Sequence, residues 1–305
     1  MSTLQLNIQS GSGSKATLTS LSLSKNALVS DLKKDYAKVC NKDIHRLSFK
    51  KEAGGEKVVR LDDDRKSIES YGIVSGDNIT FKDLGPQIGY RTVFVVEYAG
   101  PLFIMLLYAL RPAIIFGDDA ASKPWDPVAQ LGLACWALHF LKREFETFFV
   151  HKFSRPTMPL NNLFKNCAYY WAFAAVIGIP LCSTSYTGPT NESIVYGGLA
   201  LFLCSQLGNL ICHVMLRNLR PAEGSTVRPI PTGFLFDFVS CPNYTFEVMA
   251  WVGFSIMTQI PFAYAFTIVG ALQMADWANK KHKGYLKSSD KYKGLNRKAI
   301  VPFIY

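Results

Sequence analysis

Asn243, Tyr244 and Glu247 lie in the stretch SCPNYTFEV, residues 240–248, directly before a strongly apolar segment. An amide, a phenol and a carboxylate are costly to remove from water unless they are paired or face a polar cavity. Glu97 raises the same question, because it lies inside the apolar run FVVEYAGP. A phenol can act as a proton donor in a reaction. We therefore predict that these side chains share a polar reaction site that opens at the cytosolic membrane surface.

Three further polar and basic segments are candidates to line this site. Their functional groups are Lys142, Arg143 and Glu146; Asn209, His213 and Arg220; and Tyr285, Arg297 and Lys298. Helical spacing brings Lys142 next to Glu146, and Asn209 next to His213, one turn apart. Each segment also has a plainer interpretation: a basic helix flanking a membrane, a satisfied core histidine, or a tail that binds anionic lipid heads. Glu97 and Glu247 could likewise pair with Lys142 or Arg143 only to hold helices together.

Composition restricts the classes of function. The chain has 305 residues, 49% of them hydrophobic, and a formal net charge of +10. This charge fits nucleic acid, an anionic membrane surface or phosphorylated small molecules equally well. The basic residues lack the aromatic interleaving of a nucleic-acid module, so we expect no nucleic-acid partner. The seven cysteines have no metal-ligand spacing, which predicts neither a disulfide framework nor a metal site.

Residues 1–85 have the pattern of a small α+β domain. Two alternating apolar stretches, LQLNIQS and ATLTSLSL, flank the turn GSGS and predict paired strands. A helix with an apolar face of Leu28, Leu32, Tyr36 and Val39 follows, and then short strands. This order of strands and helix resembles the ubiquitin-like grasp fold. Since the chain continues past Gly85 without a di-glycine end, we expect a cytosolic folding or docking module rather than a conjugated modifier.

Residues 86–305 contain repeated apolar stretches, which predict an α-helical membrane domain. We expect about six transmembrane helices, at residues 92–114, 127–141, 164–182, 194–214, 246–262 and 263–278. The last two form one run interrupted at Pro261, so five spans are an alternative, and a buried soluble bundle is another. Basic residues concentrate between spans two and three, between four and five, and in the tail. The positive-inside rule therefore predicts a multi-pass protein with both termini in the cytosol.

Several motifs together resemble one known family. KDLGPQIGYR, KREFETFFVHKFS, MPLNNLFKNC, PNYTFEV and the ending RKAIVPFIY occur in the order and spacing of the very-long-chain trans-2-enoyl-CoA reductases of the endoplasmic reticulum. These enzymes belong to the steroid 5α-reductase superfamily, and the resemblance covers nearly the whole chain, including the ubiquitin-like region.

The resemblance implies an NADPH-dependent oxidoreductase of the endoplasmic-reticulum membrane. Such an enzyme reduces trans-2-enoyl-CoA to saturated acyl-CoA in the last step of each fatty-acid elongation cycle, with hydride added at C3 and a proton at C2. The same activity serves sphingolipid metabolism. The implied partners are the long-chain enoyl-CoA substrate, membrane lipids and the other elongation-cycle enzymes.

The resemblance also implies roles for individual residues. Tyr244 matches the proton donor, and Glu97, Lys142, Arg143 and Glu146 match other catalytic positions. The implied cofactor-binding residues are Asn209, His213, Arg220, Asn243, Glu247 and Tyr285, with Arg155 and Arg297 as phosphate-binding arginines. Steroid reductases tend to have an acidic residue in place of His213 and an arginine near Trp277. At His213 and near Trp277, these differences weaken the assignment of cofactor-binding roles by resemblance. They also argue against a steroid substrate.

Other functions remain open on the residues alone. A related reductase could act on a steroid or polyprenol enone, which competition with enoyl-CoA would reveal. A non-catalytic, membrane-anchored ubiquitin-like adaptor would tolerate changes at Glu97, Tyr244 and Arg220. Intramembrane carboxylates also suit a proton-coupled transporter, although no repeat between the two halves is visible.

Overall fold

The computed structural model describes residues 3–10, 17–53, 57–153, 155–220 and 229–305. The chain divides into two compact units. The first consists of the described parts of Met1–Tyr90 and Ser154–Asn162. The second consists of the described parts of Arg91–Phe153, Leu163–Glu223 and Val227–Tyr305.

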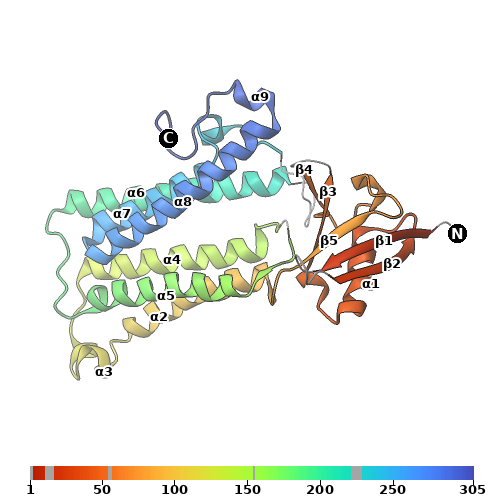
Figure 1. Ribbon diagram of the computed structural model, residues 1–305. Helices are drawn as coiled ribbons and strands as arrows, with labels where there is room; N and C mark the ends of the chain where they lie inside the picture. Colours follow the sequence, from red (N-terminus) through yellow and green to blue (C-terminus); the bar gives the residue numbers. More distant parts are fainter. Residues whose placement is uncertain (1–2, 11–16, 54–56, 154, 221–228) are drawn as a thin grey trace. The chain divides into compact units, whose positions relative to one another are not determined.

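The first unit is a mixed five-stranded sheet with one helix (Figure 1). Its elements are β1 (Thr3–Ser10), β2 (Thr17–Ser24), α1 (Val29–Cys40), β3 (Leu47–Ala53), β4 (Lys57–Arg60) and β5 (Asn78–Asp83), with short 3-10 helices at Ile44–Arg46 and Glu69–Tyr71. The strand order is β2-β1-β5-β3-β4, in which β1 pairs with β5 in parallel and every other pair is antiparallel. This arrangement confirms the predicted small α+β domain.

The alternation of β1 explains its place in the sheet. Leu4, Leu6 and Ile8 are buried, whereas the residues between them face away from the core, as a strand period of two requires. Helix α1 covers the sheet with Leu32 and Tyr36. Two short strands, β6 (Gln87–Gly89) and β7 (Thr157–Pro159), form a separate antiparallel pair in the same unit.

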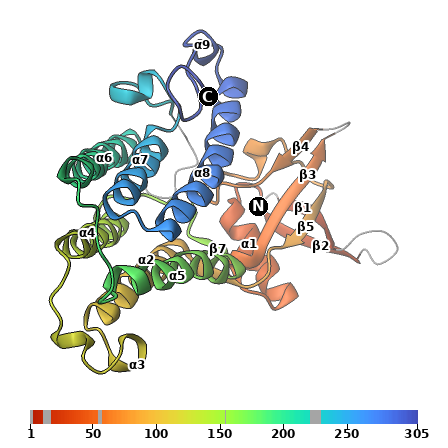
Figure 2. The same ribbon diagram turned by 90° about the vertical axis from the view of Figure 1, so that its left-hand side faces the viewer.

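The second unit is built from six long helices, one at each predicted apolar segment (Figures 1 and 2). They are α2 (Tyr90–Ala109), α4 (Pro127–Phe149), α5 (Asn161–Cys182), α6 (Glu192–Leu219), α7 (Pro242–Thr258) and α8 (Pro261–Ser288). The shorter elements are α3 (Ala113–Phe116), α9 (Asp290–Lys293) and 3-10 helices at Ala120–Ser122 and Phe234–Asp237. In the described part of the chain, α2 and α6 are long and apolar enough to cross a membrane. Six crossings therefore stay a prediction.

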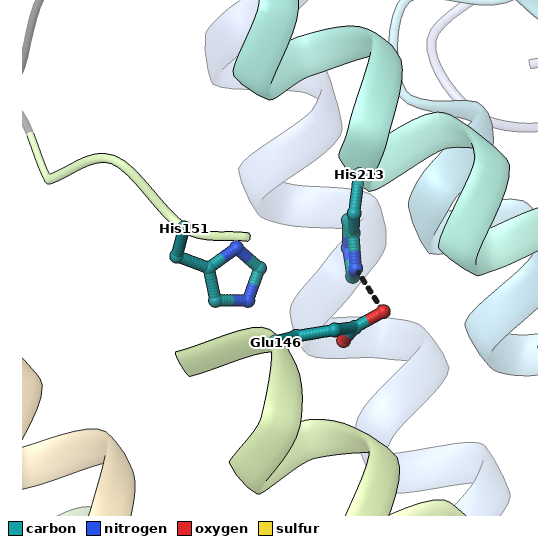
Figure 3. Close-up of side chains that lie close together, drawn as sticks. All are labelled: Glu146, His151 and His213. Atoms are coloured by element: carbon teal, nitrogen blue, oxygen red, sulfur yellow. Dashed lines mark ion pairs between the residues drawn. The ribbon is translucent and has the colours of Figure 1, made fainter. Parts of the chain in front are cut away.

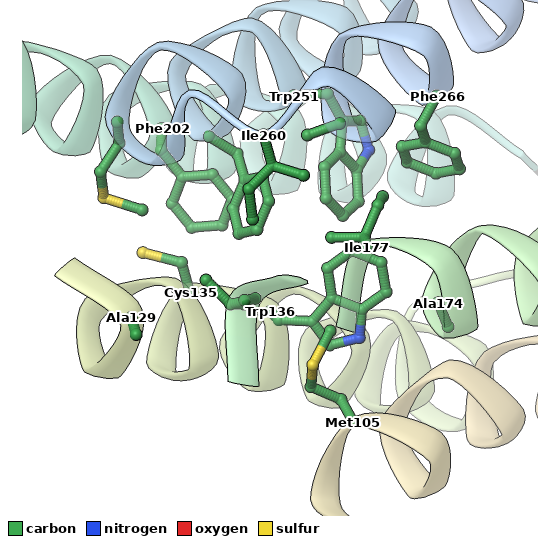
Figure 4. Close-up of a cluster of buried hydrophobic side chains, with 14 of the residues drawn as sticks. Met105, Ala129, Cys135, Trp136, Ala174, Ile177, Phe202, Trp251, Ile260 and Phe266 are labelled. Carbon is green, nitrogen blue, oxygen red and sulfur yellow. The ribbon is translucent and has the colours of Figure 1, made fainter. Parts of the chain in front are cut away.

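An aromatic core joins these helices (Figure 4). Trp136 of α4 is fully buried, and its indole N–H donates to the Pro101 carbonyl at 3.1 Å, so the buried donor is satisfied. The Trp251 ring of α7 meets the Trp136 ring at a centroid distance of 5.4 Å and the Phe266 ring of α8 edge-on at 4.7 Å. These contacts fix α7 against α4 and α8, and α7 carries the SCPNYTFEV motif at its start.

The end of the chain holds the segment before α7. Ser240 N donates to the Lys298 carbonyl at 2.8 Å, and Cys241 N donates to the Ala299 carbonyl at 3.1 Å. In return, Lys298 N donates to the Phe238 carbonyl at 2.9 Å. The terminal segment thus forms a parallel bridge beside Val239 and sets where α7 begins.

Candidate functional site

A buried ion-pair network begins on α4. Glu146 is fully buried, and its Oε2 accepts from Arg143 Nη1 at 2.6 Å. Lys142 Nζ lies 3.3 Å from the other oxygen, Oε1. The i,i+3 and i,i+4 spacing of these residues produces both contacts within one helix, as the sequence predicts. Glu146 is thus contacted by two cations of its own helix.

Helix α6 extends the network toward the start of α7. His213 Nδ1 lies 3.0 Å from Glu146 Oε1. Lys142 Nζ donates to Asn209 Oδ1 at 2.5 Å, and Asn209 Nδ2 donates to the Asn243 carbonyl at 2.8 Å. A hydrogen-bonded path therefore runs from α4 through α6 to the backbone of Asn243, which precedes Tyr244 at the start of α7.

A buried phenol also lies in the network and was missed from the sequence. Arg143 Nη2 donates to Tyr98 Oη at 2.8 Å, and its guanidinium lies 4.9 Å from the centre of the Tyr98 ring. Tyr98 of α2 is 4% exposed. The sequence offered one sign of a functional role for Tyr98, its position next to Glu97 in the motif EYAG. Its contact with Arg143 could not be predicted, because the two residues lie 45 positions apart in the chain.

The two carboxylates first singled out do not pair with Lys142 or Arg143 in the described structure. Glu97 is buried and accepts from Asn166 Nδ2 of α5 at 2.7 Å. Glu247 Oε1 lies 3.4 Å from His139 Nε2. The hypothesis that these carboxylates hold helices together by pairing with the α4 cations is therefore wrong, because Glu146 takes that place.

His139 connects Glu247 to a further polar side chain. Gln206 Nε2 lies 2.9 Å from His139 Nδ1, and Trp251 Nε1 donates to Glu247 Oε1 at 3.4 Å. These residues lie on three different helices, α4, α6 and α7. Glu247 thus has a partly buried, hydrogen-bonded place one helical turn beyond Asn243.

Tyr244 lines a cavity of about 450 Å³. The residues around it are Leu216, Leu219, Arg220, Pro229, Tyr244, Trp277, Lys280, Lys281 and Tyr285. The ring of Tyr244 lies 6.2 Å from that of Trp277. The structure therefore places three of the predicted residues, Arg220, Tyr244 and Tyr285, around one cavity with additional lysines.

Two predicted phosphate-binding arginines lie elsewhere. Arg297 is 6% exposed and donates to the Pro231 carbonyl at 2.6 Å, on the wall of a second cavity of about 290 Å³. Arg155 belongs to the first unit, where it lies 3.7 Å from Asp62. Neither arginine lines the Tyr244 cavity.

Glu146, His151 and His213 place three potential metal-ligand atoms within 4.8 Å of one another (Figure 3). His213 points at Glu146, and the His151 and His213 rings lie 5.0 Å apart. However, Arg143 and Lys142 already contact both oxygens of Glu146. Their positive charges would repel a metal cation, so this group is better described as part of the ion-pair network.

Comparisons with known proteins place the chain in a family. Residues 156–305 match the model of the family described as 3-oxo-5-alpha-steroid 4-dehydrogenase. A Trypanosoma brucei brucei protein named as an enoyl-CoA reductase is 46% identical over 99% of this chain and 100% of its own length. The very-long-chain enoyl-CoA reductase of Dictyostelium discoideum is 42% identical over 95% and 96%, respectively. This chain belongs to the very-long-chain enoyl-CoA reductase family, within the 5α-reductase superfamily.

The family relationship extends to animals and agrees with the composition of the site. A Caenorhabditis elegans protein named as a very-long-chain enoyl-CoA reductase is 47% identical over 80% of this chain and 81% of its own length. Members of this enoyl-CoA reductase family are oxidoreductases that use a nicotinamide cofactor. A cavity with a phenol, aromatic walls and cationic side chains is suited to such chemistry.

Two solved structures resemble the first unit of this enoyl-CoA reductase family member. They are the ubiquitin-like domain of an Arabidopsis thaliana protein, with 20% identity and a TM-score of 0.23, and the ubiquitin-like domain of mouse tubulin-specific chaperone e, with 18% and 0.26. They cover 27% and 28% of this chain, and 79% and 92% of the respective neighbours. Both TM-scores are low, so the α+β description of this unit rests on its own strand order, β2-β1-β5-β3-β4.

Proposed function

We propose that this protein reduces trans-2-enoyl-CoA to saturated acyl-CoA with NADPH, as the last step of very-long-chain fatty-acid elongation. The observation that carries the proposal is the position of Tyr244. It lines a cavity with Arg220, Lys280 and Lys281, and its helix start is bonded through Asn209 to Lys142. This combination supplies a proton donor, cationic groups for phosphates and a fixed geometry in one place.

The residues of the cavity fit a nicotinamide dinucleotide. Asn243 precedes the cavity-lining Tyr244 in the chain, and its buried Oδ1 has no hydrogen-bond partner among the described residues, so we assign it to a carboxamide N–H. Trp277 and Tyr285 offer aromatic surfaces to a planar ring, and Arg220 with the two lysines offers charge to phosphates. We assign Asn209, His213 and Glu247 to the support of this cofactor, and the Asn209 amide fixes the Asn243 carbonyl.

The cofactor, when bound, supplies the hydride that adds to C3 of the enoyl thioester. Tyr244 donates its phenolic proton to C2, which completes the saturated chain. Lys142 and Arg143 supply positive charge near the thioester oxygen, where negative charge develops before the proton arrives. Glu146 fixes both cations from its buried position. Glu97, held by Asn166, orients the substrate from α2.

The proposal includes a cellular setting. We assign residues 1–85 to a cytosolic ubiquitin-like domain and residues 86–305 to a reductase domain with six membrane spans in the endoplasmic reticulum. The positive-inside pattern supports cytosolic termini. The acyl chain would lie among the helices while the CoA head stays in water, and the product would serve sphingolipid synthesis and further elongation with the other cycle enzymes.

The test uses purified full-length protein in detergent. NADPH oxidation is measured with a long trans-2-enoyl-CoA, and the saturated acyl-CoA is identified by mass spectrometry. NADH replaces NADPH in one control, and a steroid enone and a polyprenol enone replace the thioester in others. We expect turnover with NADPH and enoyl-CoA alone. If the protein reduces an enone but not the thioester, it is instead a superfamily reductase that acts on steroids or polyprenols. If it does not bind NADPH, the non-catalytic ubiquitin-like adaptor is favoured.

A further inference from the structure

The guanidinium of Arg143 is held by groups on three helices. Its Nη1 donates to Glu146 Oε2 on α4 itself at 2.6 Å and lies 3.3 Å from His213 Nδ1 of α6. Its Nη2 donates to the Tyr98 hydroxyl of α2 at 2.8 Å. Because a guanidinium is planar, fixing both terminal nitrogens fixes the plane and the direction of the whole group. Tyr98 therefore supplies the fixed point for Nη2.

The Tyr98 side chain is itself firmly placed. It is buried, and its ring makes edge-on contacts with the Phe94 and Tyr170 rings, each at a centroid distance of 5.7 Å. These contacts involve the ring, so a phenylalanine would keep them. A buried hydroxyl costs free energy unless it is paired, and the Tyr98 hydroxyl is paired with Arg143 and also interacts with the neighbouring Glu97 carboxylate. The hydrogen bond to Arg143 is what a phenylalanine could not supply.

A phenol directs the guanidinium without neutralising its charge. A carboxylate partner such as Glu146 compensates the positive charge of Arg143, whereas the Tyr98 oxygen is neutral and only orients the group. An electrostatic interaction also joins Arg143 to the Tyr244 hydroxyl. The orientation of Arg143 is thus set by the fold, and a preorganised charge needs no rearrangement while negative charge develops on a substrate.

We propose that Tyr98 is a positioning residue, which holds Arg143 where the thioester oxygen acquires negative charge. The inference rests on the proposed function and assigns the two phenols to different steps of it. When a hydride adds to C3, the electron pair of the C2–C3 double bond moves onto the thioester oxygen, and NADPH is oxidised to NADP⁺. Tyr98 acts on this step through Arg143. Tyr244 acts on the next step, in which its proton goes to C2 and the electron pair returns from the oxygen.

The first test observes the bound substrate without turnover. A long trans-2-enoyl-CoA, labelled with carbon-13 at the thioester carbon, is bound to the full-length protein in detergent with NADP⁺ in place of NADPH. Isotope-edited infrared spectroscopy then reports the stretching frequency of the thioester carbonyl, which falls when a nearby positive charge polarises the bond. We expect a lowered frequency in the wild-type protein and a smaller lowering in Tyr98→Phe.

Tyr170→Phe is the matched control for this measurement. It removes a hydroxyl from a ring that packs against Tyr98, and Tyr170 is not among the hydrogen-bond partners of Arg143 in the described part of the chain. We expect this variant to keep the carbonyl frequency of the wild-type protein. Thermal unfolding shows that each variant is folded.

Turnover separates positioning from packing. Tyr98→Phe should lower kcat about tenfold and leave the KM for NADPH unchanged, because a misdirected charge affects the transition state more than binding. Deuterium at the transferred position of NADPH should slow Tyr98→Phe more than the wild-type protein, because hydride addition then limits the rate. In the Arg143→Lys background Tyr98→Phe should have little further effect, since its route of action is gone. If Arg143→Lys does not fold, the comparison of Tyr98→Phe with Tyr170→Phe decides.

Three results would overturn the inference. They are the wild-type carbonyl frequency in Tyr98→Phe, equal changes in Tyr98→Phe and Tyr170→Phe, and an undiminished effect of Tyr98→Phe in the Arg143→Lys background, which would indicate packing or action through Glu97. The proposed function fails differently. A protein that shows the expected frequencies but reduces no enoyl-CoA would contradict the proposed function and not the position of Arg143, whereas a wild-type protein that binds no enoyl-CoA would contradict both.

Discussion

The two units of the molecule differ in what they bury. The core of the first unit consists of aliphatic and aromatic side chains, from Leu4 and Leu6 on β1 to Phe81 on β5. In the described residues, every buried polar or charged side chain belongs to the helical unit, including Glu97, Arg143 and Glu146. Burial of such groups lowers stability unless they are paired, and Arg143 and Glu146 pair with each other in the helical unit.

The pairing of charges differs in the same way. In the first unit Asp83 accepts from Arg46 and Lys42 at a partly exposed position, where water screens the interaction. In the helical unit Glu146 has no exposure and depends wholly on Arg143, Lys142 and His213. The same type of contact should therefore have a small effect in one unit and a large effect in the other.

The largest expected effect concerns the proton donor. Tyr244→Phe removes the hydroxyl and keeps the ring, so kcat for enoyl-CoA reduction should fall by at least about a hundredfold while NADPH still binds. Tyr98→Phe is the matched variant, since it removes the phenol that Arg143 contacts. We expect a smaller loss there, measured as single-turnover NADPH oxidation. A larger loss in Tyr98→Phe than in Tyr244→Phe would assign proton donation to Tyr98.

The next effect concerns the buried carboxylate. Glu146→Gln leaves Lys142 and Arg143 without a compensating charge, which should lower the free energy of unfolding by about 3–5 kcal/mol. Thermal unfolding in detergent, followed by circular dichroism, measures the change. Glu69→Gln, at an exposed position of the first unit, should change it by less than about 0.5 kcal/mol. Equal effects of the two substitutions would remove the contrast between the units.

A third, intermediate effect concerns the packing of α6 against α7. A Cβ at Gly253 would lie 2.6 Å from the Gly198 carbonyl oxygen and 2.7 Å from Phe202 N, both backbone atoms that cannot turn aside. Gly253→Ala should therefore cost about 1–3 kcal/mol of stability by overpacking.

The adjacent Gly197 supplies the control for this packing. A Cβ there would meet nothing within 4 Å, so Gly197→Ala should be neutral or stabilise α6 by up to about 1 kcal/mol. Both variants are compared by thermal unfolding. Destabilisation by Gly197→Ala, or none by Gly253→Ala, would contradict the close approach of the two helices.

The smallest effect concerns the first unit. The Arg46 guanidinium and the Lys42 ammonium hold the pKa of Asp83 well below its usual range. A lowered folded-state pKa adds stability above the unfolded pKa of about 4, and this stability is lost as pH falls through the folded value.

Asp83→Asn should therefore cost less than about 1 kcal/mol at pH 7 and flatten the loss of stability below pH about 4. Hydrogen exchange of β1 and β5, read by mass spectrometry, reports on this unit, and enoyl-CoA turnover should stay unchanged. Asp35→Asn, which removes a more exposed pair with Lys38, is the control. A loss of turnover in Asp83→Asn would show that the two units are coupled in function.

Much of the fold could be predicted from local patterns in the sequence. The alternation in LQLNIQS predicted the strand β1, in which Leu4, Leu6 and Ile8 are buried, and the apolar stretches located all six long helices. The predicted face of α1 was partly wrong, because Leu28 is 37% and Val39 54% exposed. Val29 faces the core instead of Leu28, since the helix begins one residue later and the sheet, not the helix alone, selects the buried face.

The sequence by itself determined the secondary structure, the local pairs and the family. Neighbours such as Lys142 and Glu146 follow from helix geometry, because their separation of four residues leaves little choice. Only the tertiary structure decided that Arg143 meets Tyr98, that Glu97 meets Asn166, and that Arg297 lines a cavity other than that of Tyr244. Those contacts join residues 45 and 69 positions apart in the first two cases. At such separations the partner is set by how whole helices pack, which no short-range pattern contains.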